Sequence, residues 1–149
     1  MNASASDRPV LFAYDGSSFA KSAIEVAGRE LGSGRPAIVL TVWQPLEAIP
    51  FGGVAAAGTN EEVDKGVAEQ ATEVAEEGAE LAKAAGFDAE ALIERGTPTW
   101  QLIVEAADEK DASVIVLGSH GRTGIKELML GSVAGAVASH SKRAVLISH

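Results

Sequence analysis

The segment VIVLGSHGRTGIKELMLGS, residues 114–132, contains an apolar run, a glycine-rich stretch and a helix start, in that order. Its first four residues are continuously apolar, which is typical of a strand covered on both faces. The glycines that follow let the backbone approach a ligand closely and present N–H groups. At Ser132, helix N-terminal donors and the helix dipole favour an anion. The composition also suits a structural turn, so an anion site and a turn remain alternatives at this point.

The same succession of strand and helix recurs throughout the chain. Short apolar strands are expected at 10–14, 37–42 and 144–147, and a more polar edge strand at 89–94. Helices are expected at about 18–31, 59–85, 98–110 and 132–140. Five strands that alternate with four helices predict an α/β fold: a single doubly wound, open parallel sheet with helices on both faces.

The capping signals and apolar stripes of these helices can also be read from the sequence. Thr97 is expected to be an N-cap, with Pro98 at the first helical position. Ser132 is expected to open the last helix. In the long helix, the apolar stripe is expected to comprise Val63, Val67, Ala71, Val74, Gly78, Leu81 and Ala85.

A chain of 149 residues with 46% hydrophobic residues is the size of one domain with one core. We expect that domain to span residues 8–149, preceded by a short disordered tail at 1–7. The segment 44–59 is rich in glycine and proline and is expected to be a loop. Because the chain has no cysteine, disulfides, thiolate catalysis and cysteine-ligated zinc are excluded.

The charge balance narrows the classes of partner. A net charge of −9 argues against nucleic acid, because that affinity comes mainly from a basic surface. In the helix expected at 59–85, eight acidic and two basic residues account for −6 of this charge, which is typical of a solvated face. With no apolar run of about 18 residues, no membrane span is expected. The start lacks the pattern of a secretory signal, so a cytoplasmic protein is expected.

Two loops are expected to meet at the carboxyl edge of the sheet, where α/β folds bind ligands. One is the glycine-rich segment, and the other begins with Asp15 after the first strand. Asp15 is interpreted as a ligand contact in preference to a helix cap, because Ser17 and Ser18 are also available as caps. Neither G-x-x-x-x-G-K-[ST] nor a G-x-G-x-x-G after the first strand is present, which disfavours P-loop NTPases and Rossmann dehydrogenases.

The spacing of Gly118, Gly121, Gly131 and Ser132 resembles the G-x2-G-x9-G-[ST] motif of the universal stress protein (UspA-like) family, in its ATP-binding branch. The resemblance extends along the chain. Asp15, the sequence VLGSHGRTG at 116–124, the turn from Gly96 to Pro98 and the final AVLIS all fall where that family has them.

The resemblance implies a sheet order of 3-2-1-4-5, as in the adenine nucleotide alpha hydrolase-like fold. It implies ATP, with or without Mg²⁺, as the ligand at the carboxyl edge. The phosphates are expected at Gly118, Gly121, Gly131 and Ser132, and the adenine and ribose at Asp15 and Val42. Arg122 is a further candidate phosphate contact, although a solvated arm is an equal alternative. A homodimer through residues 144–147 is also implied.

Two functions from different classes fit these expectations. The first is a stress-response binding module that responds to ATP, and it is preferred. The alternative is a slow ATPase or phosphoryl-transfer enzyme that uses the same pocket, although the sequence provides at most part of the metal, charge clamp and nucleophile that such chemistry requires. A family member that binds no nucleotide is a third possibility, disfavoured by the intact glycine spacing. No catalytic residue is assigned, and the three histidines lack metal-ligand spacing.

Overall fold

The computed structural model describes residues 4–45, 60–121 and 130–149. The elements in this part of the chain are β1 (Val10–Ala13), α1 (Ser18–Glu30), β2 (Pro36–Trp43), α2 (Asn60–Ala84), β3 (Asp88–Arg95), α3 (Thr99–Glu109), β4 (Val114–Gly118), α4 (Ser132–His140) and β5 (Ala144–Ser148). The strands form a parallel sheet in the order β3-β2-β1-β4-β5. The predicted α/β fold and its strand order are confirmed.

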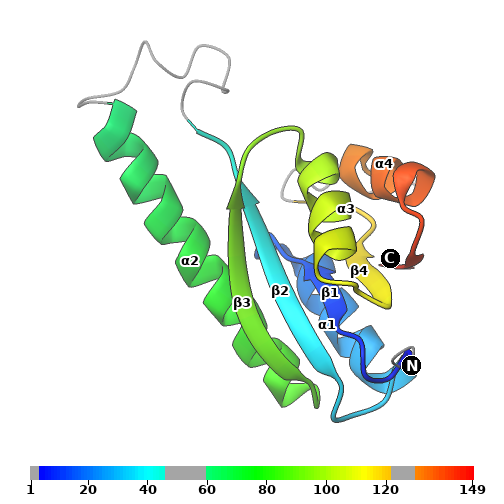
Figure 1. The fold of residues 1–149 in the computed structure, drawn as a ribbon. Coiled ribbons are helices and arrows are strands. Elements are labelled where there is room, and N and C mark those ends of the chain that lie inside the picture. Colours follow the sequence, from blue (N-terminus) through cyan, green and yellow to red (C-terminus); the bar gives the residue numbers. More distant parts are fainter. Residues whose placement is uncertain (1–3, 46–59, 122–129) are drawn as a thin grey trace.

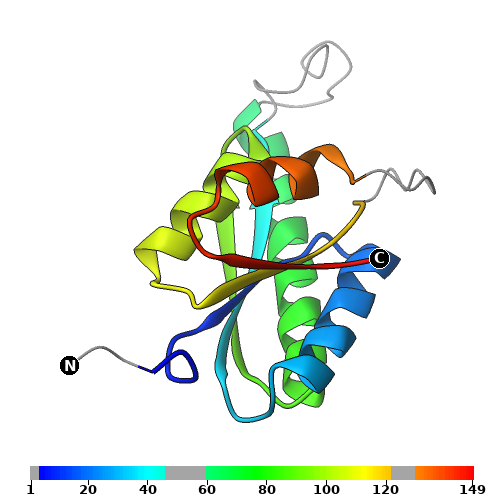
Figure 2. The same cartoon turned by 90° about the vertical axis from the view of Figure 1, so that its right-hand side faces the viewer.

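Helices cover both faces of the sheet, with α1 and α2 on one face and α3 and α4 on the other (Figures 1 and 2). Successive residues of a strand point to opposite faces. On β1, Val10 and Phe12 therefore pack with α1 and α2, whereas Leu11 packs with α3 and α4. Because both faces are covered, β1 and β4 are apolar almost throughout, as their sequences predicted.

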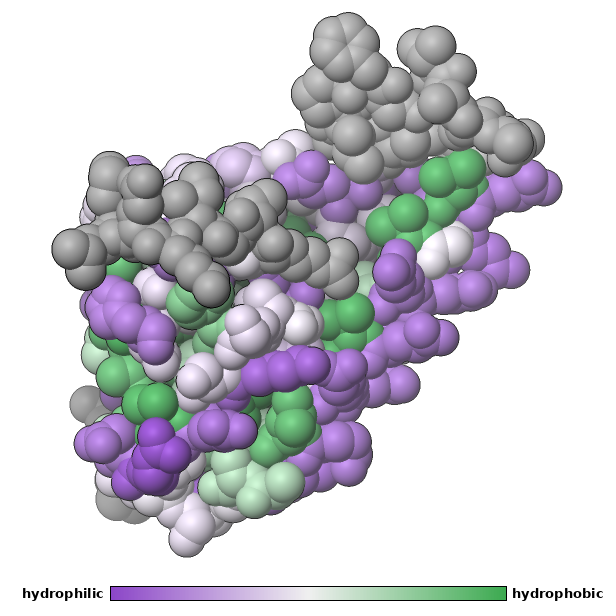
Figure 3. All heavy atoms as spheres, turned by 180° about the vertical axis from the view of Figure 1, so that it is seen from behind, coloured by the Kyte–Doolittle hydropathy of each residue, from purple (hydrophilic) through white to green (hydrophobic). Residues whose placement is uncertain are grey.

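Helix α2 packs on the sheet mainly through alanines. Ala71, Ala75, Ala79 and Ala82 are buried, whereas Leu81 is 36% exposed. The predicted stripe is therefore wrong at Leu81. The cause is at Gly78, where an added Cβ would lie only 2.6 Å from the Tyr14 ring. At this point the helix is so close to the sheet that only a small residue fits between them. Hydrophilic side chains run along the outer side of α2 (Figure 3).

The start of α3 differs from its capping prediction, whereas Ser132 opens α4 as expected. Pro98 is the N-cap of α3, and Gly131 is the N-cap of α4. Neither makes a side-chain capping bond. Thr99 and Ser132 are thus the first helical residues, and their N–H groups lie in the turn that lacks intrahelical acceptors.

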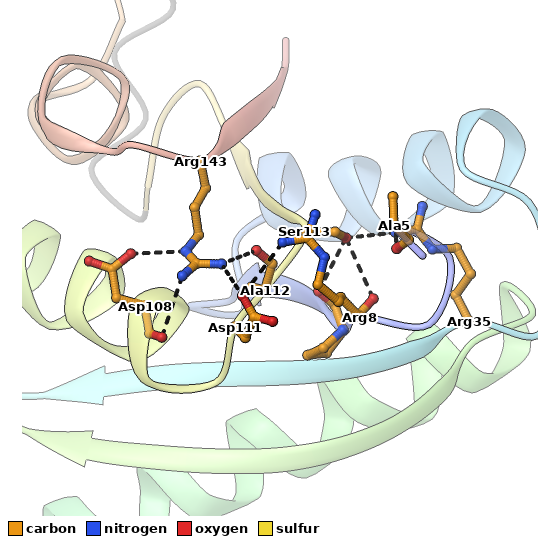
Figure 4. A network of polar contacts seen from close by, with 9 residues as sticks. Ala5, Arg8, Arg35, Asp108, Asp111, Ala112, Ser113 and Arg143 are labelled. Carbon is orange, nitrogen blue, oxygen red and sulfur yellow. Dashed lines mark hydrogen bonds and ion pairs between the residues drawn. The ribbon is translucent and has the colours of Figure 1, made fainter. Parts of the chain in front are cut away.

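An arginine-centred network joins the segments at the opposite, amino edge of the sheet (Figure 4). The Nε of Arg143, which precedes β5, donates to Asp108 at 2.9 Å, and its Nη1 donates to Asp111 at 3.0 Å and to the Ala112 carbonyl at 2.6 Å. The hydrogen bond from Arg143 to Asp111 is the main cause that holds the pKa of the Asp111 carboxyl below its usual range. The network connects the end of α3 to the start of β5.

A second arginine in Figure 4 ties the N-terminal segment to the sheet. Arg35, just before β2, donates to the Ser113 hydroxyl at 2.6 Å and to the Ala5 carbonyl at 2.7 Å. Ala5 belongs to the tail expected at 1–7, of which residues 4–7 are described. The amino edge is thus occupied by mutually bonded charges and backbone groups.

Candidate functional site

A cavity of about 580 Å³ lies at the carboxyl edge of the sheet. Its lining comes from the ends of β1, β2 and β4 and from the starts of α3 and α4. The volume is within the range of small-molecule sites, which is roughly 300–1,000 Å³. Six predicted site residues line this one cavity: Asp15, Val42, Gly118, Gly121, Gly131 and Ser132. The seventh, Arg122, lies outside the described residues.

At two positions of the cavity, neighbouring backbone comes so close that only glycine fits. A Cβ on Gly118 would lie 2.7 Å from the backbone carbon of Phe19, so this glycine lets β4 meet the first turn of α1. A Cβ on Gly131 would lie 2.9 Å from the Ser119 carbonyl oxygen, to which the Gly131 N–H donates at 2.7 Å. Because the colliding atoms are backbone, neither position has room for a side chain.

The start of α4 forms one wall of the cavity. Gly131, Ser132 and Val133 all line it, and Gly131 caps the helix without a side chain. The first N–H groups of a helix lack intrahelical acceptors and, together with the helix dipole, attract anions. Local backbone donors can thus hold an anion even though the chain has a net charge of −9.

Asp15 lies where the β1 loop meets the β4 loop. Its Oδ1 accepts a hydrogen bond from the Ser17 N–H at 2.9 Å, and the Ser17 hydroxyl in turn accepts from the Ala20 N–H. Ser17, and not Asp15, is therefore the cap of α1. The Asp15 Oδ2 lies only 2.8 Å from where a Cβ on Gly121 would be. The carboxylate thus approaches Gly121, as expected for loops at neighbouring strand ends.

The described residues that line the cavity toward β2 and α3 are apolar except for one hydroxyl. Leu40, Val42 and Ile103 line it, together with Thr99 at the start of α3. Sequence reasoning did not identify Thr99, because the turn before it has no ligand-binding motif. The topology contains the missing signal: α3 begins at the same carboxyl edge where β3 ends, as every helix that follows a parallel strand does.

Trp43, the last residue of β2, is not among the lining residues of the cavity. The Arg95 guanidinium lies 5.7 Å from the centre of the Trp43 ring. Arg95 also forms an ion pair with Asp64 of α2 at 3.8 Å. Trp43 thus packs in a contact between β2, β3 and α2.

His120 lines the cavity beside the glycine segment. Its ring makes an edge-to-face contact with Phe19, with ring centroids 5.3 Å apart. The ring therefore packs against α1. Across the described ranges, no group of three or more histidines and carboxylates is placed to hold a metal ion. In the same ranges, no helix is long and apolar enough to cross a membrane.

A polar chain connects the cavity to α2. Tyr14 lines the cavity next to Asp15, and its hydroxyl donates to the Glu77 carboxylate. The Lys21 ammonium lies 3.4 Å from the same Glu77 oxygen. Burial and the Glu77 bond raise the pKa of the Tyr14 phenol, while the Tyr14 bond holds the pKa of Glu77 below its usual range. The position of Tyr14 is thus coupled to α1 and α2.

This coupling predicts a pH-dependent contribution to stability. Because the folded pKa of Glu77 is lowered from 4.5, its contribution is present above that pH and is lost as pH falls through the folded value. We expect Tyr14→Phe to lower the free energy of unfolding by about 1 kcal/mol near neutral pH, a figure reduced for the exposure of Glu77. The difference from the wild type should shrink below about pH 4, as measured by urea unfolding. A difference that stays constant with pH would contradict this assignment.

Comparison with known proteins gives matches of sequence and of structure. The family model described as "Universal stress protein family" matches residues 8–149. "Universal stress protein YxiE" of Bacillus subtilis is 38% identical over 87 residues, which are 58% of this chain and 58% of that protein. The chain thus spans less than two thirds of this curated relative.

Two solved structures with bound nucleotides are similar over nearly the whole chain. A universal stress protein in complex with cAMP has a TM-score of 0.64 and 29% identity, covering 97% of this chain and 98% of that one. The universal stress protein from Archaeoglobus fulgidus in complex with dAMP has a TM-score of 0.62 and 25% identity, covering 97% and 99%. Both ligands are adenine nucleotides.

Proposed function

This chain belongs to the universal stress protein family, and we propose that it is a stress-response binding module whose ligand is an adenine nucleotide, with ATP preferred. The observation that supports the proposal most strongly is the cavity at the carboxyl edge, which brings together residues from three strand ends and the start of α4. The cAMP and dAMP complexes of similar proteins support the choice of adenine nucleotides.

In the proposed complex, the ligand lies along the carboxyl ends of β4, β1 and β2. The phosphates contact Gly121, Gly131 and Ser132, where backbone N–H groups and the dipole of α4 attract negative charge. Arg122 remains part of this proposal as a phosphate contact. Gly118 contributes backbone and keeps α1 close. The ribose lies at Asp15, and the base lies toward Val42.

We propose that Mg²⁺ arrives with the ATP phosphates and has no separate site on the protein. Mg²⁺ usually keeps several waters and binds through substrate phosphates and one or two carboxylates. Asp15, the carboxylate among the described lining residues, is assigned to the ribose. The ligands of the ion are therefore phosphate oxygens and waters, which fits an ion that enters with its nucleotide.

We propose binding in preference to turnover. Phosphoryl transfer requires a positioned metal, a charge clamp on the transferred group and an oriented nucleophile. Asp15, His120 and Tyr14 are the titratable groups of the described lining. The Tyr14 hydroxyl already donates to Glu77, and the His120 ring packs on Phe19. This set supports a binding site, with any hydrolysis incidental.

We also propose a homodimer that forms through β5. This strand is at the outer edge of the sheet, next to β4. Its residues Val145, Leu146 and Ile147 are only half-buried. An exposed apolar edge strand is a template for pairing with a second chain. The mass in solution, from sedimentation equilibrium, tests this part of the proposal.

The role of Asp15 predicts a specific change in affinity. Asp15→Asn keeps the Oδ1 acceptor for the Ser17 N–H but replaces the Oδ2 acceptor that we assign to the ribose. We expect about a tenfold or greater loss of ATP affinity, because hydrogen bonds to charged groups contribute roughly 1.5–3 kcal/mol. Isothermal titration calorimetry with the full chain measures the change, and thermal unfolding should match the wild type.

The loss of the Asp15 negative charge, taken by itself, would raise the affinity for ATP, whereas the loss of a ribose contact lowers it. The two explanations therefore predict opposite results. Removing a negative charge near phosphates would strengthen binding if Asp15 made no contact with the ligand. Asp88→Asn, at the start of β3 on the opposite edge of the sheet, is the control for net charge. Equal or stronger binding by Asp15→Asn, with Asp88→Asn unchanged, would refute the assignment.

A further inference from the structure

Among the described residues, one side-chain hydroxyl lines the cavity on its β2 and α3 side. Of the residues that line it from these two elements, Leu40, Val42 and Ile103 are apolar, and only Thr99 has a polar side chain. Thr99 is half-buried, and it stands one helical turn before the buried Ile103 on the same face of α3. Within the described part of the chain, the Thr99 hydroxyl has no hydrogen bond.

The order of the strands determines which part of a nucleotide reaches Thr99. Strands β2, β1 and β4 are neighbours, and the anion-attracting start of α4 follows β4. From β4 to β2 there are two inter-strand spacings, or roughly 10 Å, which suits the extended length of a nucleoside monophosphate. With the phosphates at α4 and the ribose at Asp15, the base reaches the side formed by β2 and α3.

The chemistry of that side suits an aromatic base with one polar edge. Leucine, valine and isoleucine side chains cover its apolar faces, while a buried amino group without a partner is unfavourable. A threonine hydroxyl both donates and accepts, so it can accept a hydrogen bond from an exocyclic amino group. Thr99 is the one described side chain on this side of the cavity with that capacity.

We propose that Thr99 recognises the base of the bound nucleotide by accepting a hydrogen bond from the 6-amino group of adenine. The proposal rests on the proposed function, since it assigns a part of the same site. It makes Thr99 a specificity-determining residue that favours purines with a 6-amino group over purines with hydrogen at that position.

The test compares Thr99→Val and Thr99→Ser with the wild type, as full chains. Valine has nearly the same shape without the hydroxyl, and serine retains the hydroxyl. Affinities are measured by calorimetry for ATP, for purine riboside 5′-triphosphate, which lacks the 6-amino group, and for 2′-deoxy-ATP. Thermal unfolding of each variant shows whether the fold is kept.

We expect Thr99→Val to lose about five- to tenfold in affinity for ATP and for 2′-deoxy-ATP, the effect of one neutral hydrogen bond. Its affinity for purine riboside triphosphate should equal that of the wild type, and Thr99→Ser should bind ATP nearly normally. An equal loss for all three ligands, a loss that disappears with 2′-deoxy-ATP, or no loss would overturn the proposal. A wild type that binds none of the three would instead contradict the proposed function itself.

Discussion

Gly131→Ala should reduce the affinity for ATP by about thirtyfold or more while the chain remains folded. The added Cβ would lie 2.9 Å from the Ser119 carbonyl oxygen, a backbone atom that cannot rotate away. Relief requires α4 to move from the β4 loop, which breaks the 2.7 Å bond from Gly131 to Ser119. The N–H donors at the start of α4 then leave the phosphate position. Loss of one or two charge-assisted hydrogen bonds to the phosphates weakens the free energy of ATP binding by roughly 2 kcal/mol or more.

The same helix provides the matched control. Gly135 is one turn further along α4, and an added Cβ there would meet nothing within 4 Å. Gly135→Ala should therefore bind ATP like the wild type, and it should be slightly more stable because alanine favours the helix. Calorimetry with both variants separates the two positions. Wild-type affinity in folded Gly131→Ala would show that the start of α4 does not hold the ligand.

Gly78→Ala should destabilise the protein by about 1–3 kcal/mol, the usual effect of overpacking a core. Its Cβ would lie 2.6 Å from the Tyr14 ring and 2.7 Å from a Val39 methyl, in the interface between α2 and the sheet. Because Tyr14 also lines the cavity, displacement of its ring should weaken ATP binding as well. Urea unfolding measures the first effect and calorimetry the second.

Gly66, in the same helix α2, is the matched control position for Gly78→Ala. No atom lies within 4 Å of a Cβ built there, and the residue is exposed. Gly66→Ala should therefore stabilise the protein by about 0.5–1 kcal/mol through helix propensity alone. The same substitution in one helix is thus expected to act with opposite sign at two positions. If both variants were stabilised, the close approach of α2 at Gly78 would be wrong.

Much of this architecture is predictable because the strands have a simple pattern. Strands covered on both faces are mostly apolar, so β1, β2 and β4 are apparent in the sequence even though β2 contains the buried Thr41. The buried face of α2 is less predictable. Periodicity places Leu81 inside, but the close packing at Gly78 favours alanine, and Leu81 is exposed. The packing distance between helix and sheet is a tertiary property that no window of sequence contains.

The candidate site shows the same division between local motif and tertiary geometry. The glycine spacing and Asp15 are local signals, and the cavity includes them. Thr99 is contributed by a helix with no motif, and only the strand order brings it near Val42. From the sequence, Asp15 could either cap α1 or contact a ligand. The structure shows that Ser17 caps α1 and that one Asp15 oxygen approaches Gly121.

The proposal that an adenine nucleotide occupies the cavity is tested most directly by equilibrium dialysis of the full chain against labelled ATP and Mg²⁺. We expect saturable retention that approaches one nucleotide per chain and is displaced by excess unlabelled ATP. Retention no greater than that of an unrelated acidic protein, at every ATP concentration, would contradict the account.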